Sequence, residues 1–190
     1  MVKLGQGVKR ILSYAAYDCS LRGREIVSPD HLLLALFRED YILIDAVASC
    51  YRLNSLKILE QICQNNPEAA EATPLAEVAF GHRALEIVLE AGLEAESFGH
   101  NRVRPEHLFL GLMEYKRSQL PDLFFRRAVT IQRVRELVSY LRFDSSVPSE
   151  RNSFILKGGA RMEIEHHKRR DTIFDRRQFE LVTLRLYRRF

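Results

Sequence analysis

The chain carries one signature twice, as SPDHLLLALF at residues 28–37 and as RPEHLFLGLM at residues 104–113. The copies are 76 residues apart, and at this constant offset nine positions in a 26-residue window are identical without any gap. Chance would give roughly one or two identities, whereas a period that survives without gaps indicates a structural repeat. The register also holds further on, where residues 53–62 match residues 129–138 at several apolar positions. We therefore expect two copies of one unit.

Each unit has the pattern of successive helices. The first begins with apolar residues three and four positions apart, which form one stripe on a helix: Val8, Ile11, Leu12, Ala15, Ala16 and Cys19. Gly23 and Gly99 then fall where a residue in the left-handed conformation ends a helix. Pro29 and Pro105 stand at the first position of the next helix. The runs after them are apolar nearly all round, so we expect these helices to be the most buried.

The rest of each unit predicts two shorter helices, at about residues 42–51 and 54–65 and at about residues 120–128 and 130–142. The expected fold is therefore all-α. It has about eight helices in two pseudo-twofold four-helix repeats, with unit one at residues 7–65 and unit two at residues 75–142 of a domain spanning residues 1–142. The stretch between the units, rich in Asn, Pro, Ala and Glu, is typical of a linker.

Residues 143–190 are expected to form a basic C-terminal extension. The net charge of +4 belongs to this tail, because residues 1–143 hold 18 Lys and Arg against 18 Asp and Glu, while residues 144–190 hold 11 against 7. Alternating apolar residues around Lys157-Gly158-Gly159 predict a β-hairpin, and partial disorder is the alternative. Residues 179–187 fit either a third strand or an amphipathic helix.

The doubled pattern resembles a known family. A helix ending in Gly, followed by a short loop and Pro-(Asp/Glu)-His-Leu-x-Leu-x-Leu, resembles the Clp N-terminal domain, the double repeat in front of the ATPase rings of Clp-type unfoldases. The resemblance covers about residues 7–142. It implies a non-enzymatic module that binds Clp ATPase or protease subunits, adaptors or substrates, with an accessory role in regulating proteolysis. These 190 residues contain no GxxxxGK[ST] phosphate loop, so the chain is similar to stand-alone Clp accessory proteins.

The resemblance also implies candidate binding residues. Some relatives hold phosphorylated arginine with the acidic residue of the repeated motif, which corresponds here to Asp30 and Glu106. Those relatives carry a hydroxyl residue near the start of each first helix, where this chain has Gly5 and Gly81. The alternative is structural, because a carboxylate in the first helical turn is favoured by the helix dipole. Neither role requires a cofactor.

Catalytic and metal sites are not expected. His31 and His107 precede apolar runs, which is typical of buried histidines that donate to a backbone carbonyl. The three cysteines form no CxxC pair and lie in apolar contexts, so the sequence predicts no metal site, no disulfide framework and no cysteine nucleophile. Unpaired cysteines and the lack of a long apolar run favour a protein of the cytoplasm, or of the plastid stroma in a plant, without a membrane segment.

The tail provides a second hypothesis. Basic residues alternate there with aromatic ones, which is the composition of a phosphate-backbone contact: Lys168, Arg169, Arg170, Arg176 and Arg177. A regulatory or nucleic-acid-binding protein that uses this tail is therefore the alternative to the Clp-associated module. A solvated basic face, or a tail that docks on a protein, would have the same composition. Filter binding at two salt concentrations distinguishes these hypotheses.

Overall fold

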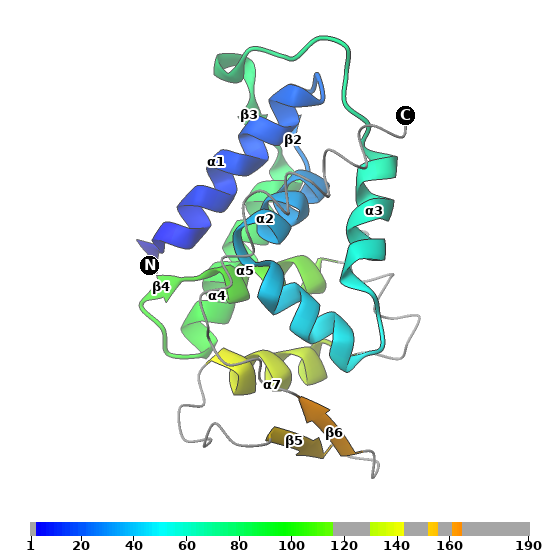
Figure 1. The fold of residues 1–190 in the computed structure, drawn as a ribbon. Helices are drawn as coiled ribbons and strands as arrows, with labels where there is room; N and C mark the ends of the chain where they lie inside the picture. Colours follow the sequence, from blue (N-terminus) through cyan, green and yellow to red (C-terminus); the bar gives the residue numbers. More distant parts are fainter. Residues whose placement is uncertain (1–2, 116–129, 143–151, 156–160, 165–190) are drawn as a thin grey trace. The chain divides into compact units, whose positions relative to one another are not determined.

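A computed structural model describes residues 3–115, 130–142, 152–155 and 161–164. The first unit of the sequence contains α1 (Gln6–Leu21), α2 (Pro29–Cys50) and α3 (Ser55–Asn65), and the second contains α4 (His82–Ser97), α5 (Pro105–Glu114) and α7 (Ile131–Arg142) (Figure 1). A short 3₁₀ turn, Leu75–Glu77, precedes α4. The expected all-α fold is confirmed. The helix predicted at residues 120–128 lies outside the described residues.

The helix α2 contains a break that divides it in two. Asp40 has non-helical dihedral angles, φ −142° and ψ 59°, and its Oδ1 accepts a hydrogen bond from the backbone N–H of Leu43 at 3.3 Å. This is the contact that a capping residue makes at the start of a new helix. The first unit therefore has four helical segments, in agreement with the separate helix expected at about residues 42–51.

The predicted glycine ends of α1 and α4 are confirmed. Gly23 and Gly99 have positive φ, 62° and 69°, a conformation that glycine adopts without steric cost. The N–H of Gly23 donates to Ser20 O, and the N–H of Arg24 donates to Cys19 O, both at 3.0 Å. Gly99 and His100 repeat this pair of bonds after α4. Both helices therefore end in a Schellman motif.

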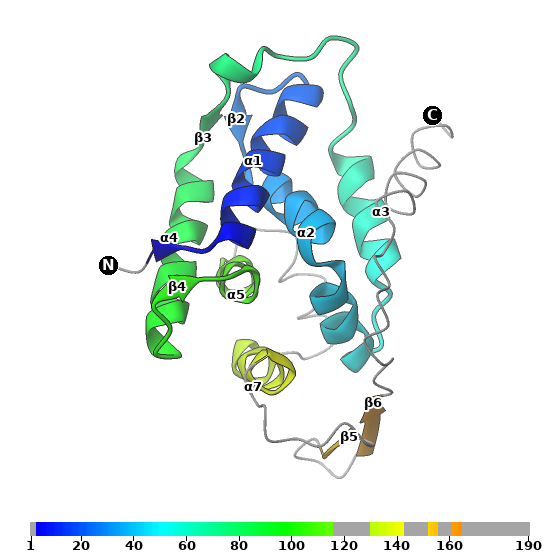
Figure 2. The same ribbon diagram turned by 60° about the vertical axis from the view of Figure 1, so that its left-hand side comes forward.

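Four very short strands, which the sequence analysis did not predict, link the two repeats. β1 (Lys3–Leu4) pairs in parallel with β4 (Arg102–Val103), and β2 (Ile26–Val27) pairs in parallel with β3 (Ala79–Phe80) (Figure 2). The strand before the first helix of each repeat thus pairs with the strand before the second helix of the other repeat. This exchange is what a pseudo-twofold relation between the repeats requires.

The core is built around the two apolar helices. All residues from His31 to Phe37 in α2 and from Glu106 to Met113 in α5 are buried. α2 packs against α1, α5 packs against α4, and α2 and α5 contact each other. Gly111 lets α5 approach α4 closely, since a Cβ there would lie 2.7 Å from the carbonyl oxygen of Ile87. None of the described helices is long and apolar enough to cross a membrane.

The chain divides into two compact units, Met1–Val138 and Ser139–Phe190, and the division falls inside α7. In the second unit, β5 (Asn152–Ile155) and β6 (Arg161–Ile164) form an antiparallel pair in which Asn152 is opposite Ile164. This pairing agrees with the expected hairpin. Residues 179–187, predicted as a strand or a helix, lie outside the described residues.

Candidate partner-binding sites

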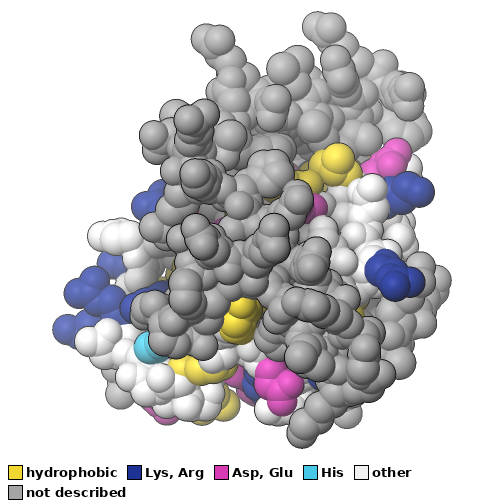
Figure 3. Space-filling model, turned by 60° about the horizontal axis from the view of Figure 1, so that its bottom comes forward, with side chains coloured by type: hydrophobic (Ala, Val, Ile, Leu, Met, Phe, Trp, Pro, Cys, Tyr) yellow, Lys and Arg dark blue, Asp and Glu magenta, His cyan; other side chains and the backbone are white. Residues whose placement is uncertain are grey.

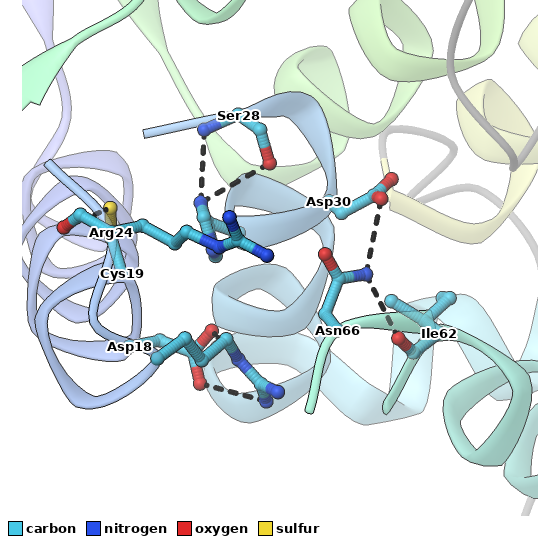
Figure 4. A network of polar contacts seen from close by, with 9 residues as sticks. Asp18, Cys19, Arg24, Ser28, Asp30, Ile62 and Asn66 are labelled. Atoms are coloured by element: carbon cyan, nitrogen blue, oxygen red, sulfur yellow. Dashed lines mark hydrogen bonds and ion pairs between the residues drawn. The ribbon is translucent and has the colours of Figure 1, made fainter. Parts of the chain in front are cut away.

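Asp30 lies in the first turn of α2 and is already engaged by the chain itself. Its Oδ2 accepts a hydrogen bond from Nδ2 of Asn66 at 3.1 Å (Figure 4). Asn66 follows the last residue of α3, and the same Nδ2 also donates to the carbonyl oxygen of Ile62 at 3.0 Å. The carboxylate therefore joins the N-terminus of α2 to the C-terminus of α3. A guanidinium that bound at Asp30 would have to share the carboxylate with this amide.

Glu106 holds the corresponding position in α5 but has different surroundings. Its side chain is almost fully buried, and Oε1 lies 3.9 Å from Nη1 of the half-exposed Arg104. The first unit has Ser28 at the position of Arg104 and so offers no such cation. The two acidic residues are thus not equivalent in the folded protein. Their role in binding a partner stays a prediction.

The two glycines at the starts of the first helices are explained by the strand exchange. Gly5 precedes α1, and a Cβ there would lie 2.6 Å from the carbonyl oxygen of Val103 in β4. Gly81 precedes α4, and its Cβ would lie 2.7 Å from Cγ2 of Ile26. At Gly5 a larger residue, such as the hydroxyl residue of the relatives, would have to displace the paired strand. At Gly81 it would have to displace the side chain of Ile26 and would crowd the carbonyl oxygen of Val27, 3.1 Å from that Cβ.

His31 and His107 are caps of α2 and α5, and the predicted direction of their hydrogen bonds is wrong. The backbone N–H of Ser28 donates to Nδ1 of His31 at 2.9 Å, and that of Arg104 donates to Nδ1 of His107 at 3.0 Å. The imidazole therefore accepts from the backbone instead of donating to a carbonyl. It occupies the third helical position, from which Glu or Gln reaches back in a capping box.

In the second unit the capping histidine belongs to an aromatic cluster. Nε2 of His107 lies 2.9 Å from Nδ1 of His100, and the Phe98 ring stacks on both imidazoles. Because Nδ1 of His107 accepts a backbone N–H, the proton of its neutral ring is on Nε2 and is donated to His100. Burial, followed by the proximity of His100 and Arg104, lowers the pKa of His107 to about 4. The ring is therefore neutral at pH 7.

An acidic residue stands at corresponding positions of α1 and α4 but pairs with a different arginine in each repeat. Asp18 in α1 pairs with Arg22, the residue that follows the helix, whose Nε lies 2.8 Å from Oδ2. Glu94, 76 residues later, pairs instead with Arg135 of α7, whose Nε lies 3.0 and 3.1 Å from the two carboxylate oxygens. Arg135 also lies 3.4 Å from Oε2 of Glu114. These contacts tie α4, α5 and α7 together.

The cysteines have the properties of structural thiols. Burial is the main cause that raises the pKa of all three, and it raises the pKa of Cys50 to about 11. Sγ of Cys19 donates to the carbonyl oxygen of Arg24 at 3.2 Å, so this residue is bound as the thiol. A nucleophilic cysteine needs the thiolate, which these surroundings disfavour. The lack of enzymatic activity stays a prediction.

Cys50 should therefore react slowly with thiol reagents in the folded protein. A pKa near 11 in place of 9.0 lowers the thiolate fraction at pH 8 by about 100-fold. The reaction with DTNB, followed by absorbance in a Cys19→Ala/Cys63→Ala background, should slow by a similar factor relative to the urea-unfolded chain. Equal rates in the two states would contradict this expectation.

An exposed apolar surface on α4 was not predicted from the sequence. Leu85, Leu89 and Leu93, which we call the leucine ridge, are spaced four residues apart and therefore lie on one face of the helix. They are 49%, 70% and 58% exposed. α1 has Lys9, Ser13 and Tyr17 at the three corresponding positions. The signal was present in the repeat itself, because leucines replace polar residues at positions where the first helix faces solvent.

Charged side chains of both signs lie on one face of the described part of the molecule. On the face drawn in Figure 3, described basic and acidic side chains appear together with hydrophobic ones.

The basic residues proposed to contact a partner through the tail, residues 168–170 and 176–177, lie outside the described residues. Among the residues that the structure describes, no three metal-ligating side chains come together.

Solved structures with a similar fold come from Clp-type proteins. The N-domain of ClpV from Vibrio cholerae matches with a TM-score of 0.62 at 20% identity, over 76% of this chain and 87% of that one. This chain has the Clp N-domain fold. Two further domains also match. The N-terminal domain of Hsp104 from Candida albicans has a TM-score of 0.57 at 15% identity, over 75% of this chain and 93% of that one. The N-terminal domain of ClpD from Arabidopsis thaliana has a TM-score of 0.55 at 16% identity, over 73% of this chain and 94% of that one. No protein-family model and no curated protein sequence matches the chain.

Within the Clp N-domain fold, the repeated signature now has a physical explanation. Pro29 and Pro105 start the central helices, the histidines cap them, and the leucines after them fill the core. The motif that carried the resemblance is therefore mainly structural. The leucine ridge has no such role in the core, because its three side chains are exposed.

Proposed function

We propose that this protein is a non-enzymatic binding module that associates with a Clp-type unfoldase or protease, or with its adaptors and substrates. The fold carries the proposal, because the similar solved structures are N-terminal domains of Clp-type proteins. The absence of a phosphate loop from these 190 residues agrees with a module that acts on an ATPase supplied by another chain. Three unpaired cysteines are consistent with action in a reducing compartment such as the cytoplasm or plastid stroma.

The surface of α4 supports protein binding in particular. Contiguous exposed apolar side chains cost solvation free energy in an isolated protein, and they are typical of interaction sites. The leucine ridge belongs to the second repeat alone, so it does not follow from the fold. A function that requires an apolar contact explains why the two repeats differ at these three positions.

Co-purification tests the proposal. The full chain, tagged and expressed in its source organism, should retain an identified Clp ATPase or protease subunit, an adaptor or a degradation substrate. The matched control is a Leu85→Lys/Leu89→Ser/Leu93→Tyr variant, which gives α4 the residues of α1 at the ridge. This variant should fold normally by circular dichroism and recover less of the Clp component. Recovery of no Clp component by the unmodified chain overturns the proposal.

A further inference from the structure

The leucine ridge continues beyond α4. Gly81 immediately precedes α4 and lies four residues before Leu85, and Cγ2 of Ile26 lies 2.7 Å from the place where a Cβ of Gly81 would be. Ile26 is itself 62% exposed. The apolar line thus runs from β2 along about two turns of α4, from Leu85 to Leu93, and its helical part is about 12 Å long. A surface of that length can be covered by a single helix of a partner protein.

Gly92 lies beside the ridge and is not explained by packing within the chain. A Cβ at Gly92 would meet nothing within 4 Å, whereas one at Gly111 would meet the backbone of α4 at 2.7 Å. Glycine in a helix interior is unfavourable compared with alanine, which α1 carries at the corresponding position, Ala16. A small residue on an open helix face allows another helix to approach closely.

The charges around the ridge specify the partner further. Glu86 and Glu90 lie along one flank of the ridge, and the exposed Glu96 follows Leu93 by three residues. On α4 the cationic groups are Arg83 and, when protonated, His82, whose Nδ1 lies 3.3 Å from Glu86. Arg135 of α7 is already bound to Glu94. A second copy of this chain would bring the same excess of carboxylates, so charge complementarity favours a basic partner.

We propose that the leucine ridge binds an amphipathic helix of a partner protein, one that carries Lys or Arg beside its apolar stripe. The apolar stripe of that helix packs on Leu85, Leu89 and Leu93, and its basic residues face Glu86 and Glu90. Gly92 is the point of closest approach. This inference rests on the proposed function, since it specifies the partner surface of the same binding module.

Peptide binding to the full chain tests the inference. The probe is a fluorescein-labelled amphipathic peptide of about 15 residues, about 22 Å long as a helix, with leucines on one face and lysines beside them. A second peptide has glutamates in place of the lysines. Fluorescence anisotropy should show binding of the lysine peptide, weakened by salt, and at least about 10-fold weaker binding of the glutamate peptide. Equal binding of both peptides, or no binding of the lysine peptide, overturns the inference.

Three variants connect that binding to the ridge. Leu89→Ser should weaken it by about 10-fold or more, while Ser13→Ala, at the corresponding position of α1, should leave it unchanged. Gly92→Ala should weaken binding and yet raise the midpoint of thermal unfolding by about 2–4 °C, a combination that a general structural defect would not produce. Binding that is unaffected by Leu89→Ser contradicts the proposal.

Three further results separate this inference from its alternatives. Sedimentation velocity that detects a dimer dissolved by Leu89→Ser would assign the ridge to a second copy and overturn the proposal. Co-purification with a Clp subunit that does not depend on the ridge, together with no peptide binding, would reject the inference and retain the proposed function. Peptide binding without any Clp component would reject the proposed function and retain the inference.

Discussion

Replacing Arg135 by methionine should lower the free energy of unfolding by about 2–4 kcal/mol, because it leaves a buried carboxylate without its cation. The side chain of Glu94 is only 8% exposed and is held by Nε and Nη2 of Arg135. Breaking a buried ion pair on one side is costly, since the remaining charge is neither hydrated nor paired. The effect should lie at the lower end of the range for such pairs, because Arg135 is 29% exposed. Urea unfolding followed by circular dichroism measures it.

The control for Arg135 is a similar pair that is more open to solvent. Arg10 of α1 contacts Glu39 of α2 in much the same way, and the two side chains are 56% and 13% exposed. Arg10→Met should therefore destabilise the protein less than Arg135→Met does. A double variant, Glu94→Leu/Arg135→Met, should recover much of the loss, because apolar residues replace the buried charges. If Arg135→Met leaves the free energy of unfolding unchanged, the ion pair with Glu94 does not stabilise the fold.

The stability of the protein should also fall as the pH is lowered from about 7 to about 5, through His107. In the unfolded chain the imidazole takes up a proton near pH 6.5, whereas burial holds the pKa of the folded ring at about 4. The contribution of the neutral His107 ring to the free energy of unfolding is therefore fully present above pH 6.5 and is lost as the pH falls toward 4. One proton more on the unfolded chain than on the folded chain lowers the free energy of unfolding by at most about 1.4 kcal/mol per pH unit. Between pH 6.5 and pH 5 the free energy of unfolding should therefore fall by up to about 2 kcal/mol.

The structural cause is the cap. Protonation of Nδ1 removes the acceptor for the backbone N–H of Arg104 and places two N–H groups against each other. Burial also lowers the pKa of His31, which acts in the same direction. His107→Gln keeps an acceptor at the third helical position without a titrating ring. The variant should lose less stability than the unmodified protein between pH 7 and about 5 in parallel urea titrations. Identical pH profiles would show that His107 does not titrate as inferred.

Local patterns predicted the helices well, because each depends on residues close together in the chain. The apolar runs after Pro29 and Pro105 lie in the core, and Gly23 and Gly99 end their helices with positive φ. Even the separation of α2 into two segments agrees with the expected helix near residue 42. These features require only helical periodicity and the conformational preferences of proline and glycine.

The surroundings of the candidate site residues could not be predicted from local patterns, because they depend on contacts between distant segments. The motif places Asp30 and Glu106 at equivalent positions, yet one meets Asn66 after α3 and the other is buried near Arg104. The capping by His107 was interpreted with the wrong hydrogen-bond direction, since the orientation of a ring is not contained in spacing. The leucine ridge was overlooked because a leucine on a helix predicts burial by default, and only packing shows which leucines stay in solvent.

The sequence by itself determined the repeat, the order of the helices, their glycine ends and the two buried central helices. Those properties follow from side chains a few positions apart, whose relation a helix sets through its own geometry. The tertiary structure decided the exchange of strands between the repeats, the cation that Glu94 receives, and the exposure of Leu85, Leu89 and Leu93. These depend on contacts between segments that are far apart in the chain, which the spacing of residues within one helix does not determine.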